Sequence, residues 1–199
     1  MSDERARLFV ALQLPGSARD ALSQWGALVL AARPGVRALS AVGLHATLCF
    51  LGARDIDELE EIAAACEGVA GAGAVALSLG PALGLPPRRP RVVAVTLQDP
   101  EGTLAAIQAT LSAVLAAASV YEPERRPFLP HVTVARVRAG AERIRAAELP
   151  APPALPFTAS AVTLYRSRLG SAGARYEGLR TIPLAGFPAP GGRAPSCGP

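Results

Sequence analysis

The two histidines of this chain stand in the same short phrase, which constrains the fold more than any other feature of the sequence. His45 opens "HATL" and His131 opens "HVTV", so a threonine follows each histidine two positions later. Successive side chains of a β-strand point to opposite faces. Each phrase therefore predicts a strand that carries an imidazole and a hydroxyl, from Thr47 or Thr133, on one face and an apolar surface on the other.

The two phrases lie 86 residues apart, and each is surrounded by a similar order of expected strands and helices. The expected strands cover residues 7–14, 36–40, 44–52, 74–80, 91–97 and 131–137, and a closing hairpin covers 157–169 and 174–184. The expected helices cover 15–33, a segment after the Asp55–Glu58 capping box, a segment opening at Asp99-Pro100, and a weaker one near 140–148. This order predicts an α+β fold with two related lobes that face each other.

The composition fits one compact domain. Half of the 199 residues are apolar, and Cys49, Cys66 and Cys197 lack any metal-site spacing, so we expect free thiols in a reducing compartment. No apolar run is as long as a membrane span, and the N-terminus shows no signal-peptide cleavage site. We therefore expect a cytoplasmic monomer in which residues 1–185 form one bilobal domain and the Pro/Gly-rich tail, 186–199, is disordered.

The basic charge of the chain is modest. The net charge is +4, and arginine supplies all 20 of the basic residues. This charge is compatible with a phosphate-bearing ligand but does not support wrapping around duplex nucleic acid. Arg88, Arg89 and Arg91 could line an approach for RNA, although a solvated loop is the more common setting for such residues. Arg125 and Arg126 could contact the substrate backbone or lie on the surface.

A pair of imidazoles beside a pair of hydroxyls suits acid–base chemistry on a phosphate. Imidazole titrates near neutral pH, so one ring can take a proton from water while the other gives one to a leaving alkoxide. The threonine hydroxyls can donate to the non-bridging oxygens and hold a phosphoryl group between the imidazoles. These residues predict metal-free cleavage of a phosphodiester, for which a strained 2′,3′-cyclic phosphate is the best-fitting substrate.

Two other interpretations of the motifs are weaker. A strand histidine near threonine is commonly a packed or solvated residue. With eight threonines in the chain, however, both histidines acquire one at this spacing by chance in roughly 0.2% of arrangements. A zinc site needs more ligands than two histidines, and no carboxylate stands at a suitable spacing. We therefore expect no metal and no cofactor.

The paired phrases resemble those of the 2H phosphoesterase superfamily. Five segments, in the right order between residues 7 and 184, are similar to the RNA 2′,3′-cyclic phosphodiesterases, a family long labelled 2′-5′ RNA ligases. The segments are "RLFVALQLP", "LHATLCFLG", "PRRPRVVAV", "RPFLPHVTVARV" and "LYRSRLGSAGARYE". The resemblance implies two pseudo-symmetric lobes, each an antiparallel sheet with flanking helices, around a central cleft.

The resemblance also implies an activity and roles for named residues. The activity is metal-independent hydrolysis of a terminal 2′,3′-cyclic phosphate to a 2′-phosphate, on RNA or on a small cyclic nucleotide. His45 and His131 are implied as the catalytic pair, and Thr47 and Thr133 as phosphate-binding residues. The family layout suggests His45 as the acid and His131 as the base, although the sequence alone does not order them.

Phe50 and Arg136, which follow the two motifs, are implied to hold the terminal base between a ring face and a guanidinium plane. Strict strand alternation would place both side chains on the face opposite the histidines. Their participation therefore requires a bulge or a strand end near position 49 or 135.

Two further functions of the same residues stay open. The pair could catalyse the reverse reaction, which forms a 2′-5′ bond, or the chain could bind RNA ends without turnover. Pure phosphate binding favours arginine over histidine, so the paired histidines favour catalysis.

Overall fold

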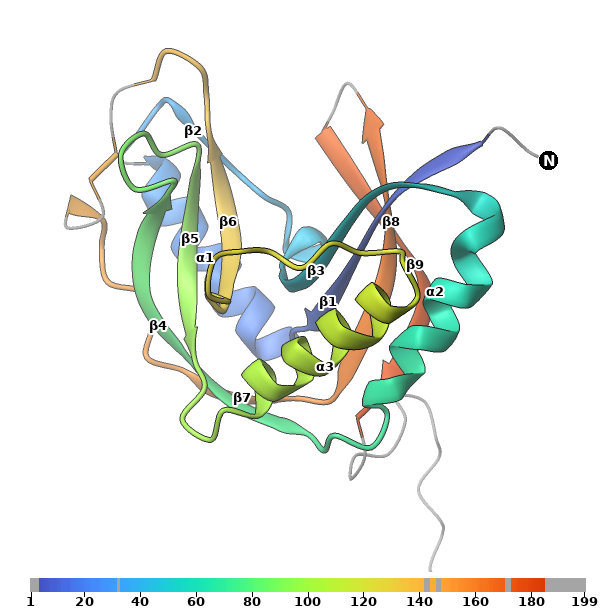
Figure 1. The fold of residues 1–199 in the computed structure, drawn as a ribbon. Helices are drawn as coiled ribbons and strands as arrows, with labels where there is room; N and C mark the ends of the chain where they lie inside the picture. The colour runs from blue at the N-terminus through green and yellow to red at the C-terminus, as the bar shows by residue number, and fades with distance from the viewer. Residues whose placement is uncertain (1–3, 32, 142–143, 146–147, 171–172, 185–199) are drawn as a thin grey trace, which may run out of the picture.

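The computed structural model describes residues 4–31, 33–141, 144–145, 148–170 and 173–184. Within these ranges, nine strands form one curled antiparallel sheet, and three α-helices pack against it and against each other (Figure 1). In sheet order the strands are β7 (Pro156–Ala159), β4 (Val75–Leu85), β5 (Val92–Gln98), β6 (His131–Val137), β3 (His45–Asp55), β1 (Arg5–Gln13), β8 (Ala161–Gly170) and β9 (Gly173–Pro183), with β2 (Val36–Ala38) also paired to β6. The predicted α+β fold is confirmed.

The sheet has two halves that meet at the two histidine strands. One half holds β7, β4, β5, β6 and β2, and the other holds β3, β1, β8 and β9 (Figure 1). The register between β3 and β6 consists of a single residue pair, Ala46 opposite Val132. The two expected lobes are therefore joined into one sheet, and both motifs lie at the junction.

The helices bury apolar stripes against the sheet and against each other. They are α1 (Gly16–Ala31), α2 (Leu59–Cys66) and α3 (Thr103–Ala117). Helix α1 packs against β2 and β6, whereas α2 packs against α3, which also reaches β3 and β4. The buried side chains of α3 recur at helical spacing, at Leu104, Ile107, Leu111 and Leu115.

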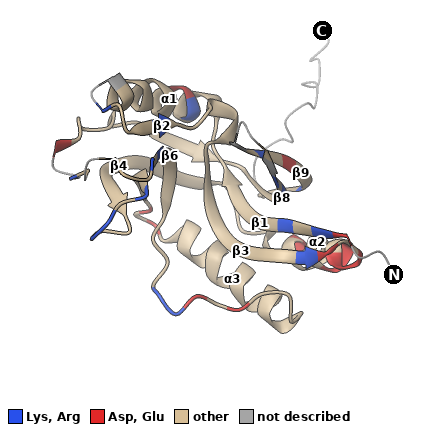
Figure 2. Ribbon diagram, turned by 90° about the horizontal axis from the view of Figure 1, so that it is seen from above, with Lys and Arg blue, Asp and Glu red and all other residues tan. Residues whose placement is uncertain are grey.

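The predicted capping box precedes α2. Asp55 and Glu58 exchange side-chain and backbone hydrogen bonds around a short 3₁₀ turn, Ile56–Glu58. Glu60 and Glu61 follow in the first turn of α2, where the helix dipole favours negative charge. Figure 2 shows that acidic residues gather around this helix.

The expected connection at 81–91 is wrong in its first half. Strand β4 continues past Pro81 to Leu85, and the register against β5 shifts between Leu79 and Ala82. The irregularity accommodates Pro81, which has no N–H for the ladder. The Pro81 carbonyl accepts a hydrogen bond from the Thr96 hydroxyl at 3.0 Å.

The expected strand 157–169 is two strands that belong to different halves of the sheet. β7 pairs with β4, and after Ser160 the chain continues as β8, which pairs with β1 and β9. The remainder of the hairpin agrees with the prediction, since β8 pairs with β9 up to Gly170 opposite Gly173. The chain therefore crosses from one half to the other at a single residue.

The expected weak helix near 140–148 is not seen in the part of this segment that is described. Ala141 donates to the Arg138 carbonyl in a turn, and Ile144 is buried in the core. The tail predicted to be disordered, 186–199, lies outside the described residues. Within the described ranges, the longest apolar helix falls short of what a membrane crossing requires.

Candidate active site

A β-bulge in β3 brings Phe50 to the same side of the strand as the first motif. The register of β3 against β1 skips Leu48 between Thr47 and Cys49. Leu48 and Cys49 are both buried, whereas Phe50 is 46% exposed. The extra residue reverses the alternation, so Phe50 shares the face of Thr47.

Strand β6 has a bulge at the corresponding position. Its register against β5 skips Val134 between Thr133 and Ala135. Val134 and Ala135 are buried, and Arg136 is exposed on the face of Thr133. Phe50 and Arg136 thus each follow their histidine by five residues across equivalent bulges. The bulges that the sequence analysis required are present, and they place both side chains on the same face as the histidines.

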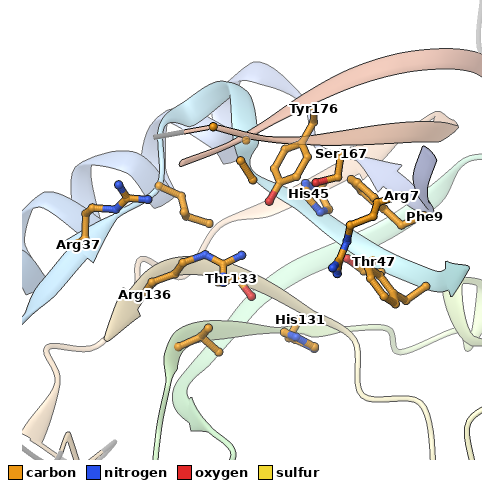
Figure 3. A pocket seen from close by; sticks show the side chains of 16 residues that line it. Arg7, Phe9, Arg37, His45, Thr47, His131, Thr133, Arg136, Ser167 and Tyr176 are labelled. Atoms are coloured by element: carbon orange, nitrogen blue, oxygen red, sulfur yellow. The ribbon is translucent and has the colours of Figure 1, made fainter. Parts of the chain in front are cut away.

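All six predicted site residues line one cavity of about 470 Å³ (Figure 3). They are His45, Thr47, Phe50, His131, Thr133 and Arg136. The other polar and aromatic side chains of the lining come from β1, β2, β8 and β9, and are Arg7, Phe9, Arg37, Ser167 and Tyr176. The cavity therefore draws on both halves of the sheet.

Each imidazole is held by the backbone two residues before it. His131 Nδ1 lies 2.8 Å from the Leu129 carbonyl oxygen. A carbonyl can only accept, so Nδ1 carries the proton and Nε2 remains for a ligand. The His45 ring makes the corresponding hydrogen bond to the backbone of Gly43. In both motifs, a backbone hydrogen bond thus fixes the orientation of the imidazole ring.

Three aromatic rings enclose His45. Phe9 stacks on it with ring centroids 4.8 Å apart, Tyr165 lies 5.9 Å away, and Tyr176 meets it edge-on at 5.0 Å. This burial excludes water from the charged form and lowers the pKa of His45 from 6.5 to about 4, against the opposing effect of the backbone hydrogen bond. Repulsion from the second imidazole adds to the lowering. In these surroundings His45 is therefore neutral at pH 7.

Removal of one of these rings should raise the pKa of His45 toward its ordinary value. In Tyr176→Ala, water reaches the imidazole, so we expect its pKa to rise from about 4 toward 6.5. The measurement is a titration of the ring carbon-bound protons by NMR, in which two histidines give a simple spectrum. Tyr121→Ala is the matched control, because no ring contact joins Tyr121 to His45 within the described residues. A pKa unchanged in Tyr176→Ala would contradict the assigned cause.

The same shift makes stability depend on pH. The folded-state pKa of His45 lies below that of the unfolded chain, so the unfolded state binds this proton more readily as the pH falls. The contribution of His45 to the free energy of unfolding is complete above pH 6.5. It is lost as the pH falls toward 4, by up to about 3 kcal/mol. His45→Gln should flatten this part of the pH dependence of the unfolding free energy.

The cavity is positively charged. Arg7, Arg37 and Arg136 line it, and no aspartate or glutamate is among its described lining residues. The Arg7 guanidinium carbon lies 5.3 Å from the ring centroid of Phe50 in a cation–π contact. Arginine donors and threonine hydroxyls together make the cavity suitable for an anion.

A second cavity of about 750 Å³ continues from the first. The two share Thr47, Phe50 and His131, and the second extends along α3 and the segment before β6. Arg126 lines this second cavity. The other basic residues considered from the sequence line neither cavity, and are Arg88, Arg89, Arg91 and Arg125.

Sequence reasoning did not identify five polar and aromatic residues of the cavity, Arg7, Phe9, Arg37, Ser167 and Tyr176. Alternation in "RLF" places Arg7 and Phe9 on one face of β1, and this pattern could have indicated them. The apolar run that follows is instead typical of a strand that is buried on both faces. Arg37 and Tyr176 carry no local signal, because pairing with distant strands brings them to the site.

Comparison with known proteins identifies the family. Residues 15–171 match the family model described as the 2′-5′ RNA ligase superfamily. The crystal structure of TT0787 of Thermus thermophilus is 30% identical, covers 89% of this chain and 97% of its own, and has a TM-score of 0.77. That of E. coli LigT complexed with 3′-AMP is 28% identical, covers 92% and 99%, and has a TM-score of 0.76. No curated protein matches the chain.

The match spans most of the sheet and both motifs, and the two solved structures share the fold along nearly their whole length. It supports a phosphoesterase or ligase-type activity. The chain belongs to the 2′-5′ RNA ligase superfamily, among the 2H phosphoesterases.

Proposed function

We propose that this protein hydrolyses the 2′,3′-cyclic phosphate at the end of an RNA to a 2′-phosphomonoester. The observation that carries the proposal is the convergence of two imidazoles and two threonine hydroxyls, from neighbouring strands, on one cavity with surplus positive charge. A crystal structure of E. coli LigT holds 3′-AMP, which supports a nucleotide ligand. Small cyclic nucleotides fit the same chemistry.

The reaction needs one proton acceptor and one proton donor. Water attacks phosphorus while one imidazole takes its proton, and the bond from phosphorus to O3′ breaks while the other imidazole protonates O3′. The phosphate stays on O2′, and proton exchange with solvent resets the pair. Thr47 and Thr133 donate to the non-bridging oxygens, and the nearby arginines stabilise the negative charge.

We assign the base to His131 and the acid to His45. The Nδ1–H of His131 is engaged by the Leu129 carbonyl, so Nε2 is the ring nitrogen left to accept the proton of the attacking water. His45 must gain a proton when the substrate binds, because its pKa in this cavity is about 4. The phosphate anion supplies the opposite charge that favours this protonation.

Phe50 and Arg136 are proposed to hold the terminal base. Both lie beyond the bulges, on the cavity side of their strands. A phenyl face stacks on any base, and a guanidinium plane can stack on the other side. This arrangement is tolerant of base identity, because it uses ring faces rather than hydrogen-bonding edges.

The test is the incubation of an oligonucleotide that ends in a 2′,3′-cyclic phosphate, with mass and chromatographic analysis of the product. We expect a mass gain of one water and a terminal 2′-phosphate. Activity should survive EDTA, because both proton transfers are assigned to imidazoles and the phosphate charge to arginine and threonine donors. Loss of turnover on chelation, with recovery on metal addition, would contradict the proposed mechanism.

The same assay separates the alternatives. Joining of the oligonucleotide to a second RNA with a 5′-hydroxyl would indicate 2′-5′ ligation as the favoured direction. Binding of the cyclic-phosphate end without any product would indicate a non-catalytic binder. Either result would replace hydrolysis as the function.

A further inference from the structure

Two arginines face each other at the edge of the cavity. Arg37 of β2 lies directly opposite Arg136 of β6 in the antiparallel register, and both line the 470 Å³ cavity. A guanidinium group has five N–H donors in a planar fork, and two such groups side by side can both donate to one anion.

A smaller hollow of about 230 Å³ continues the cavity at this pair. Arg37 and Arg136 line both spaces, and Ser40 and Tyr176 add hydroxyl groups to the smaller one. None of its described lining residues is acidic. Figure 3 shows the two arginines on one side of the cavity and Arg7 on the other. The hollow thus offers space and donors for an anion beside the threonine pair.

The spacing along β6 matches a second phosphate of the same nucleotide. Arg136 pairs with Val92 and Thr133 with Ala94, so two residues of β5 separate the two positions. Two residues of extended strand span about 7 Å, which is comparable to the separation of successive phosphates along an RNA strand.

We infer that Arg37, with Arg136, binds the phosphate on the 5′ side of the terminal nucleotide. The preferred substrates are then RNA ends and 5′-phosphorylated nucleoside 2′,3′-cyclic phosphates, over nucleoside 2′,3′-cyclic phosphates that lack the second phosphate. The inference rests on the proposed function for the direction in which the nucleotide lies. Arg136 can serve both partners, because a guanidinium stacks with its plane and donates from its edge.

The first arm of the test measures binding and needs no turnover. Adenosine 2′,5′-bisphosphate and adenosine 2′-phosphate are titrated into the protein by calorimetry. We expect wild type to bind the bisphosphate roughly ten- to a hundredfold more tightly, the effect of a charge-assisted contact. In Arg37→Gln this ratio should fall toward one. Arg37 is exposed, and the melting temperature of the variant is measured beside that of wild type to separate lost binding from lost folding.

The second arm compares kcat/KM for adenosine 2′,3′-cyclic phosphate with and without a 5′-phosphate. The ratio of the two values should exceed about ten in wild type and fall toward one in Arg37→Gln, chiefly through KM. Arg138→Gln is the matched control. It removes the same charge near the same strand end, at a position that lines none of the three cavities, and should keep the wild-type ratio.

Three outcomes would overturn the inference: no preference for the second phosphate in wild type, a preference that persists in Arg37→Gln, or an equal loss in Arg138→Gln. The last would assign the effect to long-range attraction. Preference for the bisphosphate without hydrolysis of either cyclic phosphate would support the second phosphate site and contradict the proposed function. Hydrolysis of both cyclic phosphates without a preference for the second phosphate would support the proposed function and contradict the second phosphate site.

Discussion

Replacement of either cavity histidine by alanine should lower kcat for a 2′,3′-cyclic-phosphate-ended oligonucleotide by roughly a hundred- to ten-thousandfold. His131→Ala removes the acceptor of the water proton, and His45→Ala removes the donor to O3′. KM should change little, because the threonines and arginines that hold the phosphate remain. The measurement is single-turnover kinetics by chromatography on both variants.

The design must separate lost chemistry from lost folding. Both imidazoles are only partly buried, so the variants should retain the melting temperature and circular dichroism spectrum of wild type at pH 7. The double variant should be scarcely slower than either single variant, because a proton donor and a proton acceptor act as one unit. Near-wild-type turnover in either single variant would remove the histidine pair from the mechanism.

Binding of the cyclic phosphate at pH 7 should be accompanied by the uptake of about half to one proton. Protonation of a group with a pKa of about 4 costs about 4 kcal/mol at pH 7. A negative charge at about 4 Å returns about 4 kcal/mol at an effective dielectric constant near 20. The two terms balance, so a phosphate in contact with His45 leaves the imidazole about half protonated at pH 7, and further hydrogen bonding to the phosphate favours the acid form.

Calorimetry in buffers of different ionisation enthalpy measures this uptake. Adenosine 2′,3′-cyclic phosphate serves as the ligand, since its phosphodiester does not titrate near neutral pH, and His131→Ala serves as the host, since it should turn the ligand over at least about a hundredfold more slowly than wild type. The control is the His45→Gln, His131→Ala double variant, which should take up no proton. Binding to His131→Ala without proton uptake would reverse the order and make His45 the base.

The sequence predicts the positions of the motif strands well because alternation is a local property. Strand β6 has the predicted boundaries, His131–Val137, and β3 begins one residue after the predicted start. The split after Ser160 could not be predicted, since 157–169 has a continuous strand pattern that says nothing about which partner each part will pair with. The same limit applies to Arg37, whose place beside Arg136 depends on a three-residue strand.

The two bulges could not be predicted from the local sequence. Nothing in "HATLCF" or "HVTVAR" distinguishes a regular strand from one with an extra residue, and regular alternation gives the wrong face for Phe50 and Arg136. The requirement for bulges came from the base-binding role implied by the family resemblance. The environment of His45 was likewise beyond local reasoning, because its three aromatic neighbours come from β1, β8 and β9.

The junction between β3 and β6 has a mechanical consequence. Backbone hydrogen bonds tie neighbouring strands together, and between β3 and β6 the ladder is a single residue pair, Ala46 with Val132. Each half contributes one imidazole and one threonine to the cavity. A phosphate held by both hydroxyls is therefore itself a cross-link between the halves. Under the proposed function, a phosphate bound in this way would help to fix the distance between the two histidines.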